Sequence, residues 1–281
     1  NAQGLVENVQ ILSSNLVQNG DFSEEGVQEV SNGSFSQEGV ELVTNGDFSN
    51  GSTDWNLTRG NVINDKLVFN TTGQPSGSRS VFAIQNNVAD LNKIYKVEFT
   101  ISDYVSGQFR LRKPFITSDT FGNGTYTYYG TASEINFELQ GRLDIEHNFS
   151  IDNVSVREVG QDWTLGTGWS IGEDKAVATS GSASKLQQSI SGLSGKTCKV
   201  SFTLSDYGGS GLALLDFGST SGQSITANGT YTEIGIYDQN YFQIFKDTNF
   251  TGSVTNISVK EVGQDWLLVN ATIGNDLVLL D

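Results

Sequence analysis

Apolar and polar residues alternate along several segments of this chain, which is the pattern of a β-strand that buries one face. The clearest run covers residues 95–101, in which the apolar positions are Tyr95, Val97, Phe99 and Ile101. The same face returns later in the chain as Cys198, Val200, Phe202 and Leu204. Asn-Gly and Gly-Ser pairs separate such runs at turn spacing, and no segment shows a helical apolar stripe. The pattern predicts an all-β protein in which both of these faces are buried.

A long internal repeat divides the chain. The segment YKVEFTISDY at 95–104 returns as CKVSFTLSDY at 198–207, and SIDNVSVREVGQDW at 150–163 returns as SVTNISVKEVGQDW at 253–266. Asp-Trp pairs that end at Trp55, Trp163 and Trp266 mark three unit starts. Short strands in units of this length predict two β-sandwiches and the opening of a third unit. We expect Trp55 and Trp163, which recur at unit starts, to pack in a core or an interface.

A shorter repeat with a period of 13 lies near the N-terminus, where VQNGDFS (17–23), VSNGSFS (30–36) and VTNGDFS (43–49) are three copies of one motif. Each copy is long enough for one strand and a turn. Each offers only a Val and a Phe for burial, which cannot offset the cost of ordering its backbone, about 1–2 kcal/mol per residue. The repeats therefore predict a neck that needs a partner surface. The second long unit has no such opening of its own.

Composition excludes several classes of function. The 281 residues carry a formal net charge of −16, which excludes a binder of nucleic-acid backbones or of anionic membranes. The single Cys excludes a disulfide framework and a Cys-based zinc site. No apolar run approaches the ~20 residues of a membrane span. The absence of Met, at position 1 as elsewhere, predicts a processed chain or an internal fragment.

The first long unit resembles the jelly-roll carbohydrate-binding modules of the xylan- and glucan-binding group. The resemblance lies in its opening, LVTNGDFS at 42–49 with Asp54-Trp55, in its middle strand at 95–102 and in its close, SIDNVSV at 150–156. Tandem copies that abut through EVGQDW resemble the modules of fibre and adhesin proteins from marine tailed phages. The resemblance covers roughly residues 41–263 and implies jelly-roll folds. The predicted organisation is a neck at 1–40, jelly-roll domains at 41–160 and 161–263, and the start of an incomplete third unit at 264–281.

Glycan binding requires exposed aromatic rings beside polar groups, because the C–H face of a sugar packs on a ring while its hydroxyls bond amides and carboxylates. The candidates share these side-chain types and lie near strand ends or in Tyr-rich strands: Tyr104, Tyr126, Tyr128, Tyr129, Gln140, Arg142, Tyr207, Tyr237, Tyr241 and Gln243. In the Tyr128-Tyr129 pair, consecutive strand residues point to opposite faces, so one ring must lie outward.

Related jelly rolls often hold a structural Ca²⁺ where the first and last strands meet, and the resemblance implies such a site at Asp47 and Asp152. The alternative is that these two residues only cap turns. The second unit has Thr255 in place of Asp152 and no counterpart of Asp47, so we expect no site there. No other cofactor is expected.

Catalysis has little support. The acidic residues that recur between units sit at turns, His147 has no counterpart in the second unit and is expected in an exposed loop, and Cys198 is expected to be a buried hydrophobe. We therefore expect a non-catalytic virion or extracellular protein, most simply a fibre or adhesin that attaches to a host-surface polysaccharide. By analogy with phage fibres, residues 1–49 would pack against the same region of other chains in a homo-oligomer, a trimer being favoured.

Two alternatives remain open. In the first alternative, the chain is a purely structural virion component, such as a capsid fibre or decoration protein, which has no ligand and contacts other virion proteins. In the second alternative, it is a secreted carbohydrate-binding region of a polysaccharide-degrading enzyme. The unit junctions carry no Pro/Thr linker, which favours a stacked fibre over modules on flexible linkers.

Overall fold

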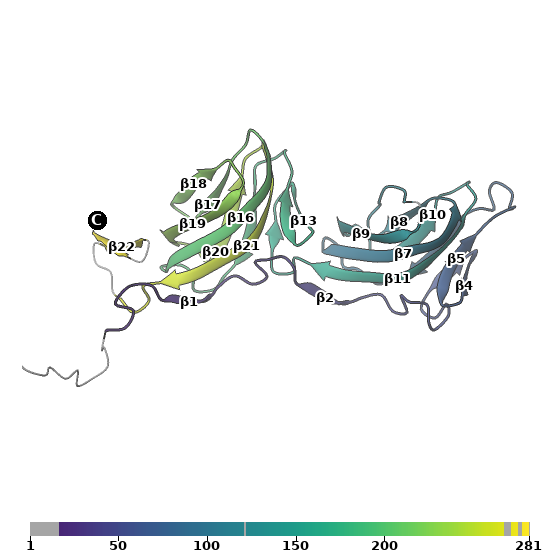
Figure 1. Cartoon of the computed structure of the whole chain (residues 1–281), viewed down its shortest axis with the longest axis horizontal. Helices are drawn as coiled ribbons and strands as arrows, with labels where there is room; N and C mark the ends of the chain where they lie inside the picture. The colour runs from purple at the N-terminus through teal and green to yellow at the C-terminus, as the bar shows by residue number, and fades with distance from the viewer. Residues whose placement is uncertain (1–16, 121, 267–270, 275–276, 281) are drawn as a thin grey trace, which may run out of the picture.

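The computed structural model describes residues 17–120, 122–266, 271–274 and 277–280, which form strands, turns and loops without a helix. No segment of this described part is therefore a helix long and apolar enough to cross a membrane. Two β-sandwiches lie one after the other, and two short N-terminal strands run along them (Figure 1). The all-β architecture predicted from the alternation is confirmed.

The first sandwich has a larger and a smaller antiparallel sheet. The larger is ordered β4 (Gly60–Ile63), β5 (Lys66–Asn70), β11 (Asn148–Val159), β7 (Ile94–Ser106) and β9 (Gly124–Thr131), with β2 (Glu38–Glu41) also paired to β11. The smaller is ordered β3 (Asn56–Thr58), β6 (Val81–Gln85), β10 (Phe137–Gly141) and β8 (Phe109–Lys113).

The second sandwich repeats this plan. Its larger sheet is ordered β13 (Trp169–Gly172), β14 (Lys175–Ala178), β21 (Phe250–Val262), β16 (Thr197–Gly209) and β19 (Gly229–Ile236), with β1 (Glu25–Gln28) also paired to β21. Its smaller sheet is ordered β12 (Thr164–Leu165), β15 (Ser184–Ser189), β20 (Tyr241–Lys246), β17 (Ala213–Asp216) and β18 (Ser221–Ile225). Beyond it, β22 (Ala271–Gly274) and β23 (Leu277–Leu280) form a two-stranded hairpin.

The cores lie between the two sheets of each sandwich. The predicted inward faces of β7 and β16 are confirmed, since all eight of their apolar side chains are at most 1% exposed. Burial of each large one stabilises its sandwich by ~1.5–3 kcal/mol. Trp55 and Trp163 are also buried, as expected for residues that recur at unit starts.

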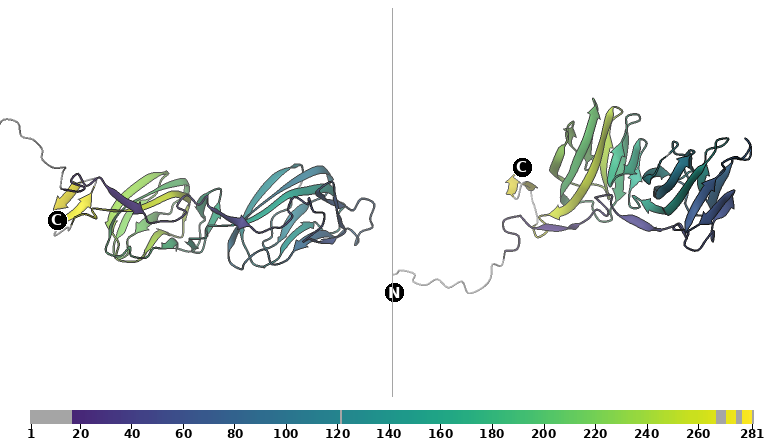
Figure 2. Two further views of the ribbon diagram at one scale, coloured as in Figure 1. Left: turned by 90° about the horizontal axis from the view of Figure 1, so that it is seen from below. Right: turned by 45° about the vertical axis from the view of Figure 1, so that its right-hand side comes forward.

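The N-terminal repeats do not form a separate neck. Val43 and Phe48 are buried in the core of the first sandwich, whereas Val30 and Phe35 are buried in the core of the second. Figure 2 shows β1 and β2 lying along the second and first sandwich respectively. The partner surface that the repeats need is thus supplied by their own chain. Val43 and Phe48 belong to the first sandwich, within the domain predicted at 41–160. The described part of the neck predicted at 1–40 is not separate, because it packs on the two sandwiches.

Each repeat docks on one of the three unit-opening tryptophans, and we call residues 17–29, 30–42 and 43–55 the first, second and third clip. The indole Nε1 donates to the backbone carbonyl of the repeat's Asn in all three: Trp266 to Asn19 at 3.0 Å, Trp163 to Asn32 at 3.1 Å, and Trp55 to Asn45 at 3.1 Å. The Phe rings pack on the same indoles, with centroid distances of 5.2, 4.9 and 5.4 Å. The order of the clips along the chain is therefore the reverse of the order of the units they serve.

The Asn-Gly sequence of the clips has a geometric cause. Asn32 adopts a left-handed conformation (φ 47°), and its Oδ1 accepts from the backbone N–H of Gln37 at 3.1 Å. Ile257 of β21 donates its backbone N–H to the Gly33 carbonyl at 2.9 Å, and a Cβ on Gly33 would lie 2.1 Å from the Ile257 carbonyl oxygen. Only glycine fits this approach.

The second clip ties the two sandwiches together. Its turn is inserted in the second sandwich, while its strand β2 pairs with β11 of the first. Glu38 of β2 forms ion pairs with Lys96 at 2.8 Å and Arg157 at 3.2 Å. The second sandwich therefore does have an Asn-Gly-x-Phe opening, contrary to expectation, but the N-terminal segment provides it.

Candidate functional site

The outer face of the smaller sheet in the second sandwich combines aromatic and polar side chains. Along β20, Phe242 and Ile244 are buried in the core, so Tyr241, Gln243 and Phe245 point to the outer face. The rings of Tyr241 and Phe245 are half-buried and stand about 13 Å apart along the strand. The outer side of β20 thus carries two half-buried rings, with the Gln243 amide, itself only 2% exposed, between them.

Polar groups on the neighbouring strands hold this amide. Asp216 of β17 accepts from Gln243 Nε2 and, at 3.1 Å, from Lys185 Nζ of β15. Lys185 lies opposite Phe245, and Gln187 lies opposite Gln243. The arrangement presents ring faces and fixed hydrogen-bonding groups side by side, which is the chemistry that recognises a sugar.

The equivalent face of the first sandwich is more strongly charged. On β10, the buried Glu138 forms an ion pair with Arg112 at 3.1 Å. Arg110 donates two hydrogen bonds to Gln140 Oε1, from Nε at 3.0 Å and from Nη2 at 2.7 Å. Phe82 and Ile84 of β6 stand opposite Gln140 and Glu138. This face therefore has one aromatic ring beside two arginine–acceptor pairs.

Most of the predicted tyrosines have structural roles. Tyr126 and Tyr128 lie on the inner side of the edge strand β9 and pack on Phe99, with centroid distances of 5.6 and 6.0 Å. The Tyr126 hydroxyl donates to the Gly122 carbonyl, and that of Tyr128 bonds Thr120. These rings close one edge of the first core.

Tyr104 and Tyr207 hold loops in the two sandwiches. Their hydroxyls donate at 2.8 Å to the carbonyls of Gly107 and Gly211. Tyr237 is fully buried against Phe217, and burial raises its pKa far above the usual value. It has no exposed ring face to offer to a sugar.

Tyr129 does point outward, as the alternation requires, but it packs against the second sandwich beside β13. Its partial burial raises its pKa. Arg142 follows β10 and pairs with Asp119 at 2.7 Å. Of the ten predicted residues, Gln140, Tyr241 and Gln243 are therefore the three on the outer faces of the smaller sheets.

Sequence reasoning missed the neighbours of these three residues. They lie on strands paired to β10 or β20, or alternate with core residues along those strands: Phe82, Ile84, Arg110, Arg112, Glu138, Lys185, Asp216 and Phe245. The available signal was the alternation in FELQG (137–141) and YFQIFK (241–246), which places one set of side chains outward.

The predicted calcium ligands lie at a close contact between two segments. Val154 donates its backbone N–H to the Gly46 carbonyl at 2.9 Å, which brings the stretches containing Asp47 and Asp152 together. The Ser49 hydroxyl and N–H donate to Asp47 and lower its pKa. In the part of the chain that the structure describes, no group of three or more His, Cys, Asp or Glu side chains could hold a metal.

The same contact in the second sandwich corrects one expectation. Thr255, the counterpart of Asp152, donates its hydroxyl to the Ser34 carbonyl at 3.2 Å. Ser34 of the second clip therefore occupies the position of Asp47, which was expected to have no counterpart. The pair of acids in the first sandwich is replaced here by a direct hydrogen bond.

His147 is fully buried, contrary to the expectation of an exposed loop. Its Nε2 donates to the Arg142 carbonyl at 2.8 Å, and its ring fills the space beside Gly107 and Gly141, where side chains are absent. Burial lowers its pKa. Cys198 is buried as expected, and burial raises its pKa to about 12, which disfavours the nucleophilic thiolate form.

Comparison with known proteins adds little. No protein-family model matches the chain, and no curated protein matches it. Among solved structures, the N-terminal CBM22-1–CBM22-2 tandem domain of Xyn10C from Paenibacillus barcinonensis is similar over 80% of this chain and 99% of its own, with 12% identity and a TM-score of 0.31. Allantoicase from Saccharomyces cerevisiae is similar over 71% of this chain and 82% of its own, with 8% identity and a TM-score of 0.25. The sandwich architecture of this chain therefore rests on its own strand pairing.

Proposed function

We propose that the chain is a non-catalytic protein that binds neutral polysaccharides through the outer faces of its smaller sheets. The observation that carries the proposal is β20, where Tyr241 and Phe245 flank Gln243, with Asp216 and Lys185 beside it. Two rings on one strand suit successive sugars of an extended chain. The net charge of −16 disfavours an anionic polymer.

Pairing of the carboxylates on these faces supports binding rather than hydrolysis. Glycoside hydrolysis needs two carboxyl groups facing each other across the bond, ~5–9.5 Å apart. Glu138 is already held by Arg112, and Asp216 by Lys185 and Gln243. Carboxylates bonded in this way can orient amides and accept from sugar hydroxyls.

The wider proposal is a virion-surface or extracellular fibre or adhesin that presents these faces to a host-surface glycan. The second clip supports it, because a strand on one sandwich and a turn inside the next fix the two in a row. Homo-oligomerisation stays a prediction, although the repeats that motivated it pack on their own chain. A structural Ca²⁺ at Asp47 and Asp152 also stays a prediction, which chelator-dependent melting of the chain would test.

Affinity electrophoresis against a panel of neutral polysaccharides tests the binding face. We expect retardation by at least one of them, and a weakening of about 2–10-fold in Tyr241→Ala, since an aromatic contact contributes ~0.5–1.5 kcal/mol. The matched control is Ile236→Ala, which removes a side chain that is 52% exposed on β19 of the other sheet. Equal binding by Tyr241→Ala and the wild type would show that this face is not the polysaccharide-binding site.

A purely structural role is the second candidate, and the clips favour it, because they stabilise a row of sandwiches without reference to a ligand. In that case no polysaccharide in the panel retards the wild-type chain, while the row itself remains folded.

A further inference from the structure

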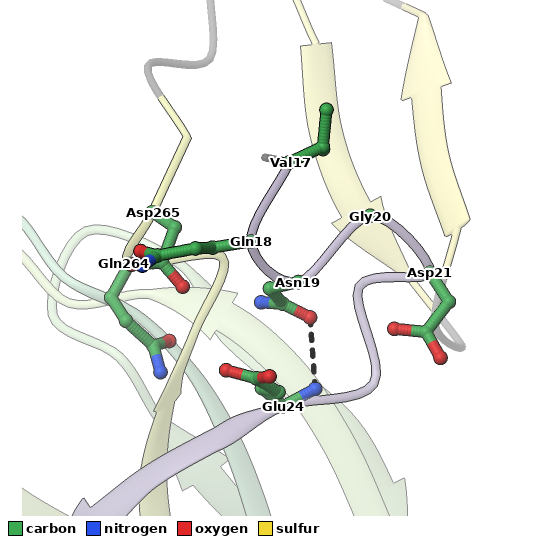
Figure 3. Close-up of a pocket in the computed structure, with 8 residues that line it drawn as sticks. All are labelled: Val17, Gln18, Asn19, Gly20, Asp21, Glu24, Gln264 and Asp265. Carbon is green, nitrogen blue, oxygen red and sulfur yellow. Dashed lines mark hydrogen bonds between the residues drawn. The ribbon is translucent and has the colours of Figure 1, made fainter. Parts of the chain in front are cut away.

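The first clip is built like the other two. Asn19 Oδ1 accepts from the backbone N–H of Glu24 at 2.9 Å, as drawn in Figure 3, and the Trp266 indole donates to the Asn19 carbonyl. Phe22 packs on Trp266 with a centroid distance of 5.2 Å. Downstream, β1 pairs with β21, in the same register that β2 has on β11.

Burial separates the first clip from the other two. Val17 is 50% exposed, whereas Val30 and Val43 are 5% and 6% exposed. Trp266 is 39% exposed, whereas Trp163 and Trp55 are 8% and 6% exposed. The first clip therefore presents apolar side chains at one end of the molecule.

An open hollow of about 830 Å³ lies at this clip. Its lining includes Val17, Asn19, Gly20 and Asp265 (Figure 3). A Cβ on Gly20 would meet nothing closer than a Val17 methyl at 3.3 Å. At Gly33 and Gly46 the equivalent Cβ would lie 2.1 and 2.0 Å from a strand carbonyl. In the other two clips, the close approach of a strand requires glycine at this position. The first clip also has glycine there, Gly20, although no strand of the described residues lies against it.

The second and third clips show what such a strand belongs to. In each, the Gly carbonyl accepts a hydrogen bond from a backbone N–H in the last strand of the sandwich. Ile257 donates to Gly33, and Val154 donates to Gly46. A glutamine side chain of the smaller sheet also bonds the clip backbone twice, as Gln188 does at Ser31. Both groups come from the body of a sandwich, the part that follows its opening hairpin.

The opening hairpin of a third unit is also present. β22 and β23 pair as β13 and β14 do, but β14 continues the sheet by pairing with β21. An isolated two-stranded hairpin is marginally stable in water. The first clip and this hairpin are two separate parts of one sandwich opening.

We propose that the first clip and Trp266 are the docking site for the body of a third β-sandwich of the same design. The body brings a last strand whose backbone N–H bonds the Gly20 carbonyl and a glutamine that bonds the Gln18 backbone. Docking buries Val17, Phe22 and Trp266 as their counterparts are buried. The inference concerns assembly and does not depend on glycan binding.

The test appends a copy of residues 179–263, the body of the second sandwich, directly after Leu280. We expect the amides of residues 17–23 to gain protection from hydrogen exchange and Trp266 emission to shift to shorter wavelength. The matched variant is Gly20→Ala. We expect the 281-residue chain to tolerate it, because the new methyl group meets only the half-exposed Val17 side chain, at 3.3 Å. The same methyl group blocks the approach of a strand, so the gain in protection should be lost. A folded third body that leaves residues 17–23 as unprotected as before would overturn the proposal.

A second variant decides the question if the appended body does not fold. Ser31→Gln, Ser34→Asp and Gln37→Glu together place the turn sequence of the first clip at the second. If the first clip is made for a sandwich body, amide exchange in β16 and β21 stays within about twofold of the wild type, as for surface substitutions. Loss of protection across both strands would show that the first turn cannot serve a sandwich.

Discussion

The two sandwiches share their clip and differ on the outer face of the smaller sheet. In both, a 13-residue repeat inserts Val and Phe into the core, and the carbonyl of its glycine accepts a hydrogen bond from a backbone N–H of the last strand. On the outer face, Glu138 paired with Arg112 in the first sandwich is replaced by Gln243 bonded to Asp216 in the second. The frame is thus repeated while the polar chemistry of the face changes. This division is typical of a scaffold whose binding properties vary between copies.

A buried basic group also differs between them. Gly141 in the first sandwich leaves room for His147, since a Cβ there would lie 2.9 Å from the His147 Nε2. At the corresponding position of the second sandwich, the buried Lys246 donates to the Ser182 carbonyl at 2.9 Å. Burial lowers the pKa of both groups, from the ordinary 6.5 of histidine and the ordinary 10.5 of lysine. Because these starting values differ, acidification acts on the two sandwiches in different pH ranges.

The largest expected effect comes from truncating a clip side chain. Phe35→Ala removes a ring packed on Trp163 and should destabilise the second sandwich by about 3–5 kcal/mol. Phe48→Ala should do the same to the first sandwich. Hydrogen exchange of β16 and β21 against β7 and β11 reports the two separately. Equal effects of one variant on both sandwiches would break the assignment of clips to units.

A smaller loss is expected when the clip glycine gains a methyl group. Gly33→Ala forces the clip away from Ile257 and should cost the second sandwich about 1–3 kcal/mol. Gly20→Ala is the matched control in the same chain and should change neither sandwich. Urea denaturation followed by tryptophan emission measures both. A Gly33→Ala chain as stable as the control would show that the close approach is not required.

Acidification should weaken the first sandwich selectively. Burial holds the pKa of His147 below the value of 6.5 that it has when unfolded. Protons therefore bind the unfolded state first, and stability falls as pH decreases below about 6.5, levelling off at the folded pKa. Exchange protection of β7 and β11 between pH 7.5 and 5.5 should decline, and His147→Gln should remove this decline. If exchange protection in the wild-type chain does not change with pH, the assignment of His147 as a buried neutral histidine is contradicted.

The smallest effect concerns the ion pairs that hold the clip strands. Glu38→Gln loosens β2 from the first sandwich, and Glu25→Gln loosens β1 from the second, where Glu25 bonds Lys199 and Lys260. These pairs are partly exposed, so each change should cost less than about 1 kcal/mol and fade at high salt. Salt-independent losses would indicate packing rather than charge.

Local patterning predicted the strands and cores well, because a period of two directly places Val97 or Val200 on a buried face. It could not assign Asn32 to Trp163, since 131 residues separate them and their contact arises only when two sheets assemble. A signal did exist, because three short repeats matched three Asp-Trp pairs in number. Burial of His147 was beyond reach, because it depends on glycines in two other segments.

The central claim is that the N-terminal repeats complete sandwiches of their own chain in reverse order. Disulfide trapping tests it directly in a chain with Cys198→Ala, using Ser34→Cys with Thr255→Cys, where the Thr255 hydroxyl bonds the Ser34 carbonyl. We predict a rapid intramolecular disulfide in this pair and none between Ser34→Cys and Asp152→Cys, the equivalent position of the first sandwich. Disulfide-linked dimers or trimers, or preferential trapping at position 152, would contradict the account.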